Sequence, residues 1–326
     1  MPHSHKPLAL VTGGAGFIGS QLVEALLTAG WHVVVIDNLS SGKRKFVHPA
    51  AAFIKQDIAS PKVSEWILRM KPKAVFHLAA QISVNTSIKE PIRDAETNVM
   101  ASLGLIDAAS RAGVERFVFA SSGGALANEQ YLPTKETDPV EPLSPYAIAK
   151  YTIERYGAFY REQYGLPFVS MRFANVYGPR QNPEGEAGVI SIFASRMLMN
   201  ETLQVNGTGK QTRDFVFVED VVGAIMSVIA KPGLTGTFNV GTGKETDIAT
   251  LYKKMAKITC YRKKAKKGPA DKNAPMRSVL NASHLHQVTG WKPKVKIDDG
   301  LRQTIIWFET NWKPKKGVMA ALRCFL

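Results

Sequence analysis

A glycine-rich turn near the amino terminus constrains the fold of this chain more than any other feature. Residues 11–19 read Val-Thr-Gly-Gly-Ala-Gly-Phe-Ile-Gly; an apolar run at 8–11 leads into them and a stretch with helical periodicity follows at 20–27. A second apolar run at 31–36 then ends at Asp37. Strand, tight turn, helix, strand and acid in this order are the signature of a dinucleotide-binding βαβ unit. The turn therefore indicates a cofactor site, the alternative being a glycine-rich loop that binds nothing.

The residues of this unit suit particular parts of a dinucleotide. The glycines permit the turn and let the backbone approach a pyrophosphate, and the first N–H groups of the helix face the anion. Asp37 can accept hydrogen bonds from a ribose diol, and its charge would repel a 2′-phosphate, so NAD is favoured over NADP. Lys43 and Arg44 follow closely and could weaken that preference. The cofactor contacts expected here are Gly13, Gly16, Phe17, Ile18, Gly19, Asp37 and Asn38.

Further apolar runs at residues 52–58, 74–80 and 116–120 alternate with helical stretches. This alternation predicts an α/β fold whose main domain is a doubly wound parallel sheet of the Rossmann type. A smaller mixed α/β domain would hold the substrate, with a cleft between the two domains. The expected boundaries are 1–172 with 214–240 for the NAD-binding domain, and 173–213 with 241–326 for the substrate domain.

The carboxyl ends of these strands carry further candidates, because ligands of a parallel sheet bind at that edge. Asp57 could reach an adenine amine or could cap the following helix. Ala79 and Ala80 are small residues where a cofactor backbone would pass. Ser122 follows the strand predicted at 116–120.

Tyr146 and Lys150 lie four residues apart in a helical stretch that runs to about residue 160. This spacing places both side chains on one helical face, about 6 Å apart along the axis. A lysine ammonium close to a phenol stabilises the phenolate and lowers the pKa of the tyrosine towards working pH. Because Ser122 could hold a substrate hydroxyl beside them, the three residues predict a proton-transfer site.

Composition bounds the remaining possibilities. The formal net charge of +15 fits an anionic substrate with phosphates, and it also fits non-specific attraction to nucleic acid. Many cations lie at 253–267, where Tyr261 and the neighbouring Tyr252 are the only aromatic residues, so a solvated basic face is favoured over a nucleic-acid platform. The two cysteines are too few for a disulfide framework or a metal cluster, and we expect no metal. The lack of a long apolar run or of a signal peptide's apolar segment predicts a cytoplasmic protein.

With these motifs in order, the chain resembles the extended short-chain dehydrogenases/reductases that act on nucleotide sugars, and among them the UDP-glucose 4-epimerase-like proteins. The similarity runs from about residue 8 to about residue 308. Besides the glycine turn, the segments that carry it are 37–38, 57–58, 77–80, 98–99, 119–125, 144–150, 172–180 and 211–216.

The resemblance implies roles for the proton-transfer residues and the cofactor site. Tyr146 would be the acid/base, Lys150 its electrostatic partner and the holder of the nicotinamide ribose, and Ser122 the hydroxyl positioner. Ile58 and Asn98 would join the cofactor contacts. The family's habit also implies a homodimer formed through the helix that carries Tyr146.

The resemblance also implies a substrate site for a UDP-sugar. Asn175 would contact the sugar diphosphate and Arg213 a phosphate oxygen, since a guanidinium fork matches phosphate geometry. The alternative for Arg213 is a structural ion pair with Asp214 or Glu219. Ser278 aligns with a position beside the sugar 2-substituent, where a small residue leaves space for an N-acetyl group.

Three segments depart from the family pattern. Residues 126–128 read Leu-Ala-Asn where relatives have a Val-Tyr-Gly-like run. Residues 271–274 replace a turn that usually supplies a uridine-diphosphate-binding arginine, and Arg277 or Lys272 could take its place. The tail from residue 313 matches nothing that we can place.

The reaction follows from what succeeds Ser122. Relatives that dehydrate the sugar place an acid pair there, and sugar-acid decarboxylases a glutamate, whereas this chain has Gly123 and Gly124. Glycine cannot move protons, so reversible oxidation at C4, a 4-epimerase reaction on UDP-glucose and UDP-galactose, is favoured. Two alternatives stay open: a non-catalytic NAD-binding protein whose basic surface binds RNA or another partner, and another nucleotide-sugar enzyme of the same family.

Overall fold

The computed structural model of the protein describes residues 6–184, 188–269 and 275–312. Its centre is a seven-stranded sheet with the strand order β3-β2-β1-β4-β5-β6-β10, in which all neighbours are parallel. The order reverses between β1 and β4, which is the doubly wound arrangement. The strands are β1 (Leu8–Thr12), β2 (His32–Asp37), β3 (Ala52–Lys55), β4 (Ala74–His77), β5 (Arg116–Ser122), β6 (Phe168–Phe173) and β10 (Gly236–Val240). The predicted Rossmann-type fold is confirmed.

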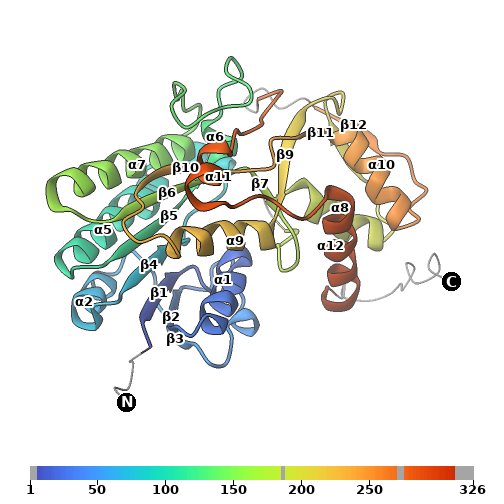
Figure 1. Ribbon diagram of the computed structural model, residues 1–326. Coiled ribbons are helices and arrows are strands. Elements are labelled where there is room, and N and C mark those ends of the chain that lie inside the picture. Colours follow the sequence, from blue (N-terminus) through green and yellow to red (C-terminus); the bar gives the residue numbers. More distant parts are fainter. Residues whose placement is uncertain (1–5, 185–187, 270–274, 313–326) are drawn as a thin grey trace.

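Helices cover both faces of this sheet (Figure 1). On one face α1 (Phe17–Thr28) and α9 (Val218–Ile229) share an apolar cluster with the sheet; on the other, α2 (Pro61–Met70), α5 (Ser102–Arg111) and α7 (Pro145–Tyr164) share a second. Along β1, Leu10 joins the second cluster and Val11 the first. Burial on both faces explains why these strands read as continuous apolar runs in the sequence.

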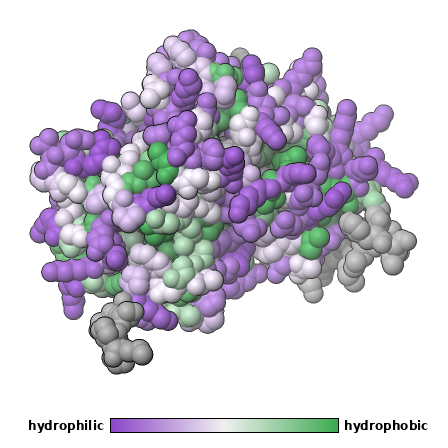
Figure 2. Space-filling model, in the orientation of Figure 1, coloured by the Kyte–Doolittle hydropathy of each residue, from purple (hydrophilic) through white to green (hydrophobic). Residues whose placement is uncertain are grey.

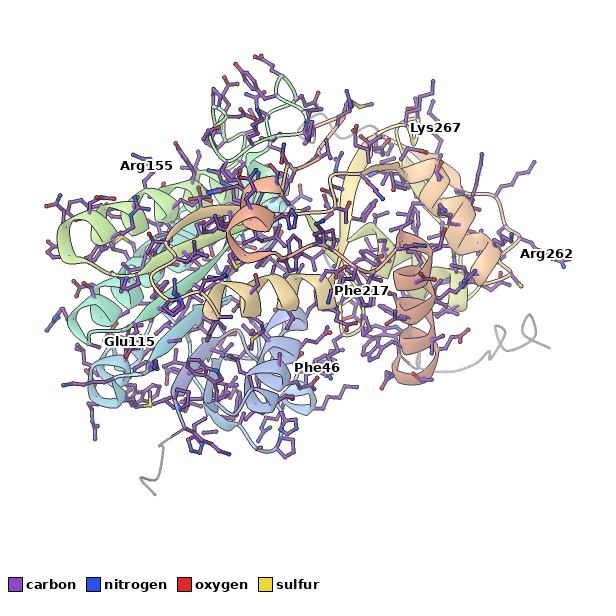
Figure 3. The ribbon with its side chains drawn as sticks, in the orientation of Figure 1. Phe46, Glu115, Arg155, Phe217, Arg262 and Lys267 are labelled. Carbon is purple, nitrogen blue, oxygen red and sulfur yellow. The ribbon has the colours of Figure 1, made fainter. Side chains whose placement is uncertain are left out.

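A second group of elements forms a smaller α/β unit, on the right of Figure 1. Tyr177, Phe215 and Phe217 lie in its apolar core, and Phe217 is labelled in Figure 3. Its small sheets are β11 (Glu245–Asp247), β9 (Thr212–Phe217) and β7 (Asn175–Tyr177), and β12 (Lys266–Gly268) with β8 (Gln204–Asn206); its helices are α8 (Val189–Leu198), α10 (Ile248–Ile258) and α12 (Ile297–Asn311).

Short helical segments complete the described chain. They are η1 (Arg44–Phe46), α3 (Val84–Lys89), α4 (Pro91–Ala95), α6 (Gly123–Leu126), α11 (Ser283–Thr289) and the π-helical η2 (Glu96–Ala101). The strand expected at 52–58 ends at Lys55, so Asp57 follows it in a loop. Within the described residues, no helix is both long and apolar enough to span a membrane.

The lysine-rich segment, residues 253–267, lies on the outer surface of the smaller unit. Hydrophilic residues cover this side of the molecule in Figure 2, and Arg262 and Lys267 extend outward from it in Figure 3. Lys254 forms an ion pair with Asp298 of α12, with 2.7 Å between Nζ and Oδ1. This arrangement fits the solvated basic face expected from the sequence.

Candidate active site

The glycine turn forms a backbone cradle between β1 and α1. Gly13 has a φ of +71°, and a Cβ there would lie 2.7 Å from the backbone nitrogen of Ala79. A Cβ on Gly19 would lie 2.1 Å from the carbonyl oxygen of Gly13. Gly16 caps α1 without a side-chain hydrogen bond, so the first-turn N–H groups of Phe17, Ile18 and Gly19 have no capping side chain. The cradle fits a pyrophosphate, because only glycine lets the backbone approach this closely.

Asp37 at the end of β2 is buried and supports the turn. Its Oδ2 accepts the Ala15 N–H at 3.0 Å, and its Oδ1 accepts the Leu39 N–H at 2.8 Å. Each carboxylate oxygen retains a further lone pair for a ribose hydroxyl. Asp37 therefore shapes the loop and also fits its predicted role as a ribose contact.

Asp57 is joined to the loop after β2. Its Oδ2 accepts a hydrogen bond from the Asn38 side-chain amide at 2.7 Å, and its Oδ1 accepts the Ala59 N–H at 2.9 Å. The N-cap of α2 is Ser60, so the alternative that Asp57 caps this helix is wrong. Ile58 is buried in the apolar cluster beneath α2.

A buried hydrogen-bond chain that the sequence analysis missed fixes the floor of the cradle. The Ala79 N–H donates to Thr12 Oγ1 at 3.3 Å, and Thr12 Oγ1 also forms a hydrogen bond with His77 Nδ1 at 2.8 Å. His77 Nε2 forms a second hydrogen bond, with Ser102 Oγ, also at 2.8 Å. Burial lowers the pKa of His77 to about 3, with the charge of Lys150 as a second cause, so the ring is neutral. The sequence did offer one signal for a role of His77 in the cradle: it lies near the end of the apolar run at 74–80, close to Ala79.

Asn98 lies in the π-helical segment and organises the loop beyond Ala79 and Ala80. Its Nδ2 donates to the Gln81 carbonyl and to Asp94 Oδ1, both at 2.8 Å, and its Oδ1 accepts the Gln81 N–H at 2.9 Å. Single π-helical turns within α-helices are frequent at functional sites. Asn98 thus supports the cradle through its neighbours' backbone.

The structure brings Ser122, Tyr146 and Lys150 together where β5 ends and α7 begins. Ser144 caps α7, accepting the Ala147 N–H at 3.2 Å, so Tyr146 lies in the first turn. Lys150 is buried; its Nζ donates to the Ala120 carbonyl at 2.9 Å and lies 5.7 Å from the centre of the Tyr146 ring. Ser122 Oγ accepts the Ala125 N–H at 3.2 Å.

The expectation that Lys150 lowers the pKa of Tyr146 is wrong for this structure. Burial raises the pKa of Tyr146 to about 12; its hydrogen bond with Ser122 lowers the pKa and the charge of Asp94 raises it. Burial also lowers the pKa of Lys150 to about 8, against the charges of Asp94 and Glu154, which raise it. Desolvation, which a linear spacing cannot reveal, is therefore the largest influence on the pKa of both groups.

A buried ion pair lies behind this cluster. Glu154, one helical turn after Lys150, accepts hydrogen bonds from Arg172 on β6, with 2.6 Å between Oε2 and Nη2. Its Oε1 also accepts the hydroxyls of Ser121, at 2.6 Å, and Ser170, at 3.1 Å. Glu154 thereby joins the helix of Lys150 to the strand that ends in Ser122.

On the substrate side, Asn175 begins β7, and its Oδ1 is buried without a hydrogen-bond partner among the described residues. A Cβ on Gly124 would lie 3.6 Å from that oxygen, which places Asn175 next to the loop after Ser122. Ser278 is buried, and its carbonyl accepts the Asp214 N–H at 2.9 Å. An orphan amide oxygen here fits a ligand hydroxyl or N–H donor.

Arg213 and Arg277 are the two candidate arginines, and the backbone of both lies close to that of Ser278. Arg213 donates from Nη1 to the Thr212 carbonyl at 2.7 Å. Asp214, offered as its ion-pair partner, accepts hydrogen bonds from Thr242, Gly243 and Leu280 instead. Arg277 is held by Glu245, with 2.5 Å between Nη2 and Oε2.

The structure describes the glycine after Ser122 and one of the three segments that depart from the family pattern. A Cβ on Gly123 would lie 2.2 Å from Leu280 Cδ1, so Leu280 occupies the space that a side chain after Ser122 would need. In the 126–128 segment, Asn128 is buried and accepts the Gln130 N–H at 2.9 Å. The 271–274 turn with Lys272, and the tail from residue 313, lie outside the described residues.

Comparison with known proteins agrees with this geometry. A family model described as the NAD dependent epimerase/dehydratase family matches residues 9–241. The UDP-glucose 4-epimerase of Mycolicibacterium smegmatis is 41% identical over 308 residues, covering 93% of this chain and 98% of that protein.

Solved structures extend the comparison. UDP-glucose 4-epimerase from Thermotoga maritima, crystallised with UDP-glucose, is 43% identical with a TM-score of 0.90 and covers 94% of this chain and 100% of its own. The Thermus thermophilus enzyme in complex with NAD is 39% identical with a TM-score of 0.88, covering 93% and 99%. A UDP-N-acetylglucosamine 4-epimerase from Methanobrevibacter ruminantium is 33% identical with a TM-score of 0.89, covering 94% and 99%.

Proposed function

The chain belongs to the NAD-dependent epimerase/dehydratase family, and from that premise we propose that it is an enzyme that interconverts UDP-glucose and UDP-galactose at C4. One observation carries the proposal: Ser122, Tyr146 and Lys150 gather beside a glycine cradle, while Gly123 and Gly124, which follow Ser122, supply no further acid. The reaction then needs one proton-transfer group, a hydride acceptor and a pocket for the sugar.

The cradle residues fit NAD, which supplies the hydride acceptor for C4 and the donor for the return step. Gly13, Gly16 and the first turn of α1 would hold the pyrophosphate, and Asp37 a ribose. Lys150 would hold the nicotinamide ribose. Asp57, Ile58, Ala79, Ala80 and Asn98 would complete the cofactor contacts.

Tyr146 moves the proton in this proposal. In the phenolate form, its Oη, linked to Ser122, would take the proton of the 4-hydroxyl and later return it, so no net proton leaves the site. Because burial raises the pKa of this phenol, the phenolate needs the positive charges of Lys150 and of bound NAD beside it. Ser122 orients the same hydroxyl. Asn175 and Arg213 contact the diphosphate, and the small Ser278 leaves space for the sugar to present either face and for an N-acetyl group at C2.

The test is turnover of UDP-galactose to UDP-glucose by the purified protein, with Tyr146→Phe as the matched variant. We expect Tyr146→Phe to lower kcat by about 10²–10⁴-fold, the usual contribution of general acid–base catalysis, while bound NAD, measured after denaturation, is retained. Normal turnover by the variant would overturn the role of Tyr146. NAD binding by wild type without turnover of any UDP-sugar would support the non-catalytic alternative.

Comparing kcat/KM for UDP-glucose and UDP-N-acetylglucosamine tests the pocket beside Ser278. We expect both sugars to be substrates. Complete inactivity towards the acetylated sugar would contradict the role of Ser278.

We also propose a homodimer in which a second copy covers the outer face of α7. Ile148, Tyr156 and Phe159 are exposed on this helix, and Arg155, from the same face, is labelled in Figure 3. A shallow cavity of about 410 Å³ on this face is lined by Tyr151, Thr152, Arg155, Tyr156 and Phe159.

Two expectations from the sequence stay predictions. A cytoplasmic location can be checked by cell fractionation, and the domain boundaries at residues 172, 213 and 240 by limited proteolysis.

A further inference from the structure

The loop that follows Asp37, residues 38–46, is tied back to the glycine turn that it follows in the chain. Asp37 accepts the Ala15 N–H at 3.0 Å, and the Lys43 N–H donates to the Ala15 carbonyl at 2.9 Å. A Cβ on Gly42 would lie 3.0 Å from the same carbonyl oxygen, so the two backbones approach closely. This cofactor loop therefore flanks the place where we put the pyrophosphate of NAD and the ribose at Asp37.

The cofactor loop is only weakly buried. Of residues 38–46, five are exposed and none is fully buried. Exposed loops with few buried apolar contacts open at a small cost in free energy. The closed position of this loop therefore depends on the contacts of its half-buried members, above all Lys43 and Phe46.

Those two side chains contact the smaller unit. The Phe46 ring lies 6.1 Å from that of Trp307 on α12, centre to centre, with 59° between the ring planes. The guanidinium carbon of Arg180 lies 5.8 Å from the centre of the same Phe46 ring. Lys43 Nζ lies 4.5 Å from the centre of the ring of Trp312, the residue that ends α12. Figure 3 shows Phe46 beside α1, on the side towards α12.

The helix that receives these contacts is a firm support. Leu301, Ile305 and Phe308 of α12 are buried in the apolar core of the smaller unit. An aromatic pair or a cation–π contact changes an equilibrium by about two- to tenfold. Several such contacts between the cofactor loop and the smaller unit are thus enough to keep a weakly buried loop closed.

We propose that α12 latches the cofactor loop over the glycine turn and so retains NAD between the two hydride steps. The proposed reaction takes a hydride from C4 and returns it to the same carbon, so the cofactor has to stay bound in between. From the proposed function the inference takes only NAD as the cofactor and adds the means of its retention. Phe46 is a positioning residue in this latch, because it acts through the loop and not on the substrate.

The experiment measures how fast NAD bound to the purified protein exchanges with isotopically labelled NAD in solution. Phe46→Ala removes the ring that Trp307 and Arg180 contact. We expect it to speed the exchange by about five- to fiftyfold, as the loss of two ring contacts predicts. Phe46→Tyr keeps the ring and should exchange like wild type. Phe46→Leu, which keeps apolar volume without the ring, replaces the alanine variant if that one does not fold.

A second variant tests the latch from the side of α12. Trp307→Leu should speed the exchange by about two- to tenfold, and it should add nothing in the Phe46→Ala background, where the contact is already lost. The control is Tyr252→Leu, which breaks ring contacts with Phe193 and Tyr261 inside the smaller unit and should exchange like wild type.

Three results would overturn the latch: unchanged exchange in Phe46→Ala, equal acceleration by Tyr252→Leu, or additive effects of Phe46→Ala and Trp307→Leu. Reduced thermal stability of Phe46→Ala without faster exchange would make the contact merely structural and would count against the latch in the same way. A wild-type protein that shows the expected exchange but converts no UDP-sugar would refute the proposed function alone. A wild-type protein that binds no NAD would refute both.

Discussion

His77 shows how one buried side chain can fix the place where a cofactor backbone must pass. It is held by Thr12 on one side and by Ser102 on the other, and Thr12 in turn holds Ala79 against Gly13. Both ring nitrogens are hydrogen-bonded to hydroxyl groups inside the protein, and burial disfavours the charged ring. The neutral form is therefore part of the fold.

This makes the stability of the protein depend on pH in a defined direction. The pKa of His77 is lowered to about 3 in the folded state, against about 6.5 in the unfolded chain. Between these values the unfolded state binds more protons, so the free energy of unfolding falls as pH falls, by up to about 1.4 kcal/mol per pH unit from this residue. Urea unfolding measures the free energy of unfolding at pH 7 and at pH 5. Between these pH values it should fall less for His77→Gln than for wild type, although the variant is less stable at pH 7. His32→Gln, an exposed histidine on β2, should keep the wild-type loss; an equal loss in all three proteins would contradict the assignment.

At the scale of elements, one face of α7 carries both the reacting residues, Tyr146 and Lys150, and, one turn later, the residue that fixes the helix to the sheet, Glu154. Glu154 ties the helix to β5 and β6 through Ser121, Ser170 and Arg172. We expect Glu154→Gln to lower the free energy of unfolding by about 3–5 kcal/mol, because it leaves the buried Arg172 without its counter-charge. Glu162→Gln, which breaks an exposed ion pair with Arg161 on the same helix, should cost less than about 1 kcal/mol. Chemical denaturation measures both, and similar small losses would show that the buried pair does not anchor the helix.

Elements with a strong local signal were predictable from the sequence, and those defined by tertiary contacts were not. Continuous apolar runs located β1, β2, β4 and β5, because strands buried on both faces leave no polar alternation. The helical spacing of Tyr146 and Lys150 likewise placed both on one face of α7. The π-helical turn at Asn98 and the buried place of His77 depend on hydrogen bonds between distant segments. The predicted direction of the Tyr146 pKa shift was wrong for the same reason, since desolvation arises from packing across the whole site.

At the scale of the molecule, the seven-stranded sheet and the three-stranded sheet belong to different units, and β9 is the middle strand of the three-stranded one. β9 pairs with β7 and β11, whereas α9 and β10, which follow it in the chain, return to the large sheet. Arg180 adds a direct link, since its guanidinium binds Glu24 and Ser20 of α1. The chain thus crosses between the two units several times, which ties the substrate side to the cofactor cradle.

The outer face of α7 sets the last expectation. Phe159 and Ile148 are about half exposed there, 48% and 51%, although the inner face of the same helix is buried in the sheet. Apolar side chains gathered on one exposed helix are typical of an interface, and a twofold dimer places the same face of both copies in contact. Phe159→Glu would put two charges into that contact, so light scattering after gel filtration should give a dimer for wild type and a monomer for the variant. Ile306→Glu, at an equally exposed position on α12, should stay dimeric; a monomeric wild type, or dissociation by Ile306→Glu alone, would place the interface elsewhere.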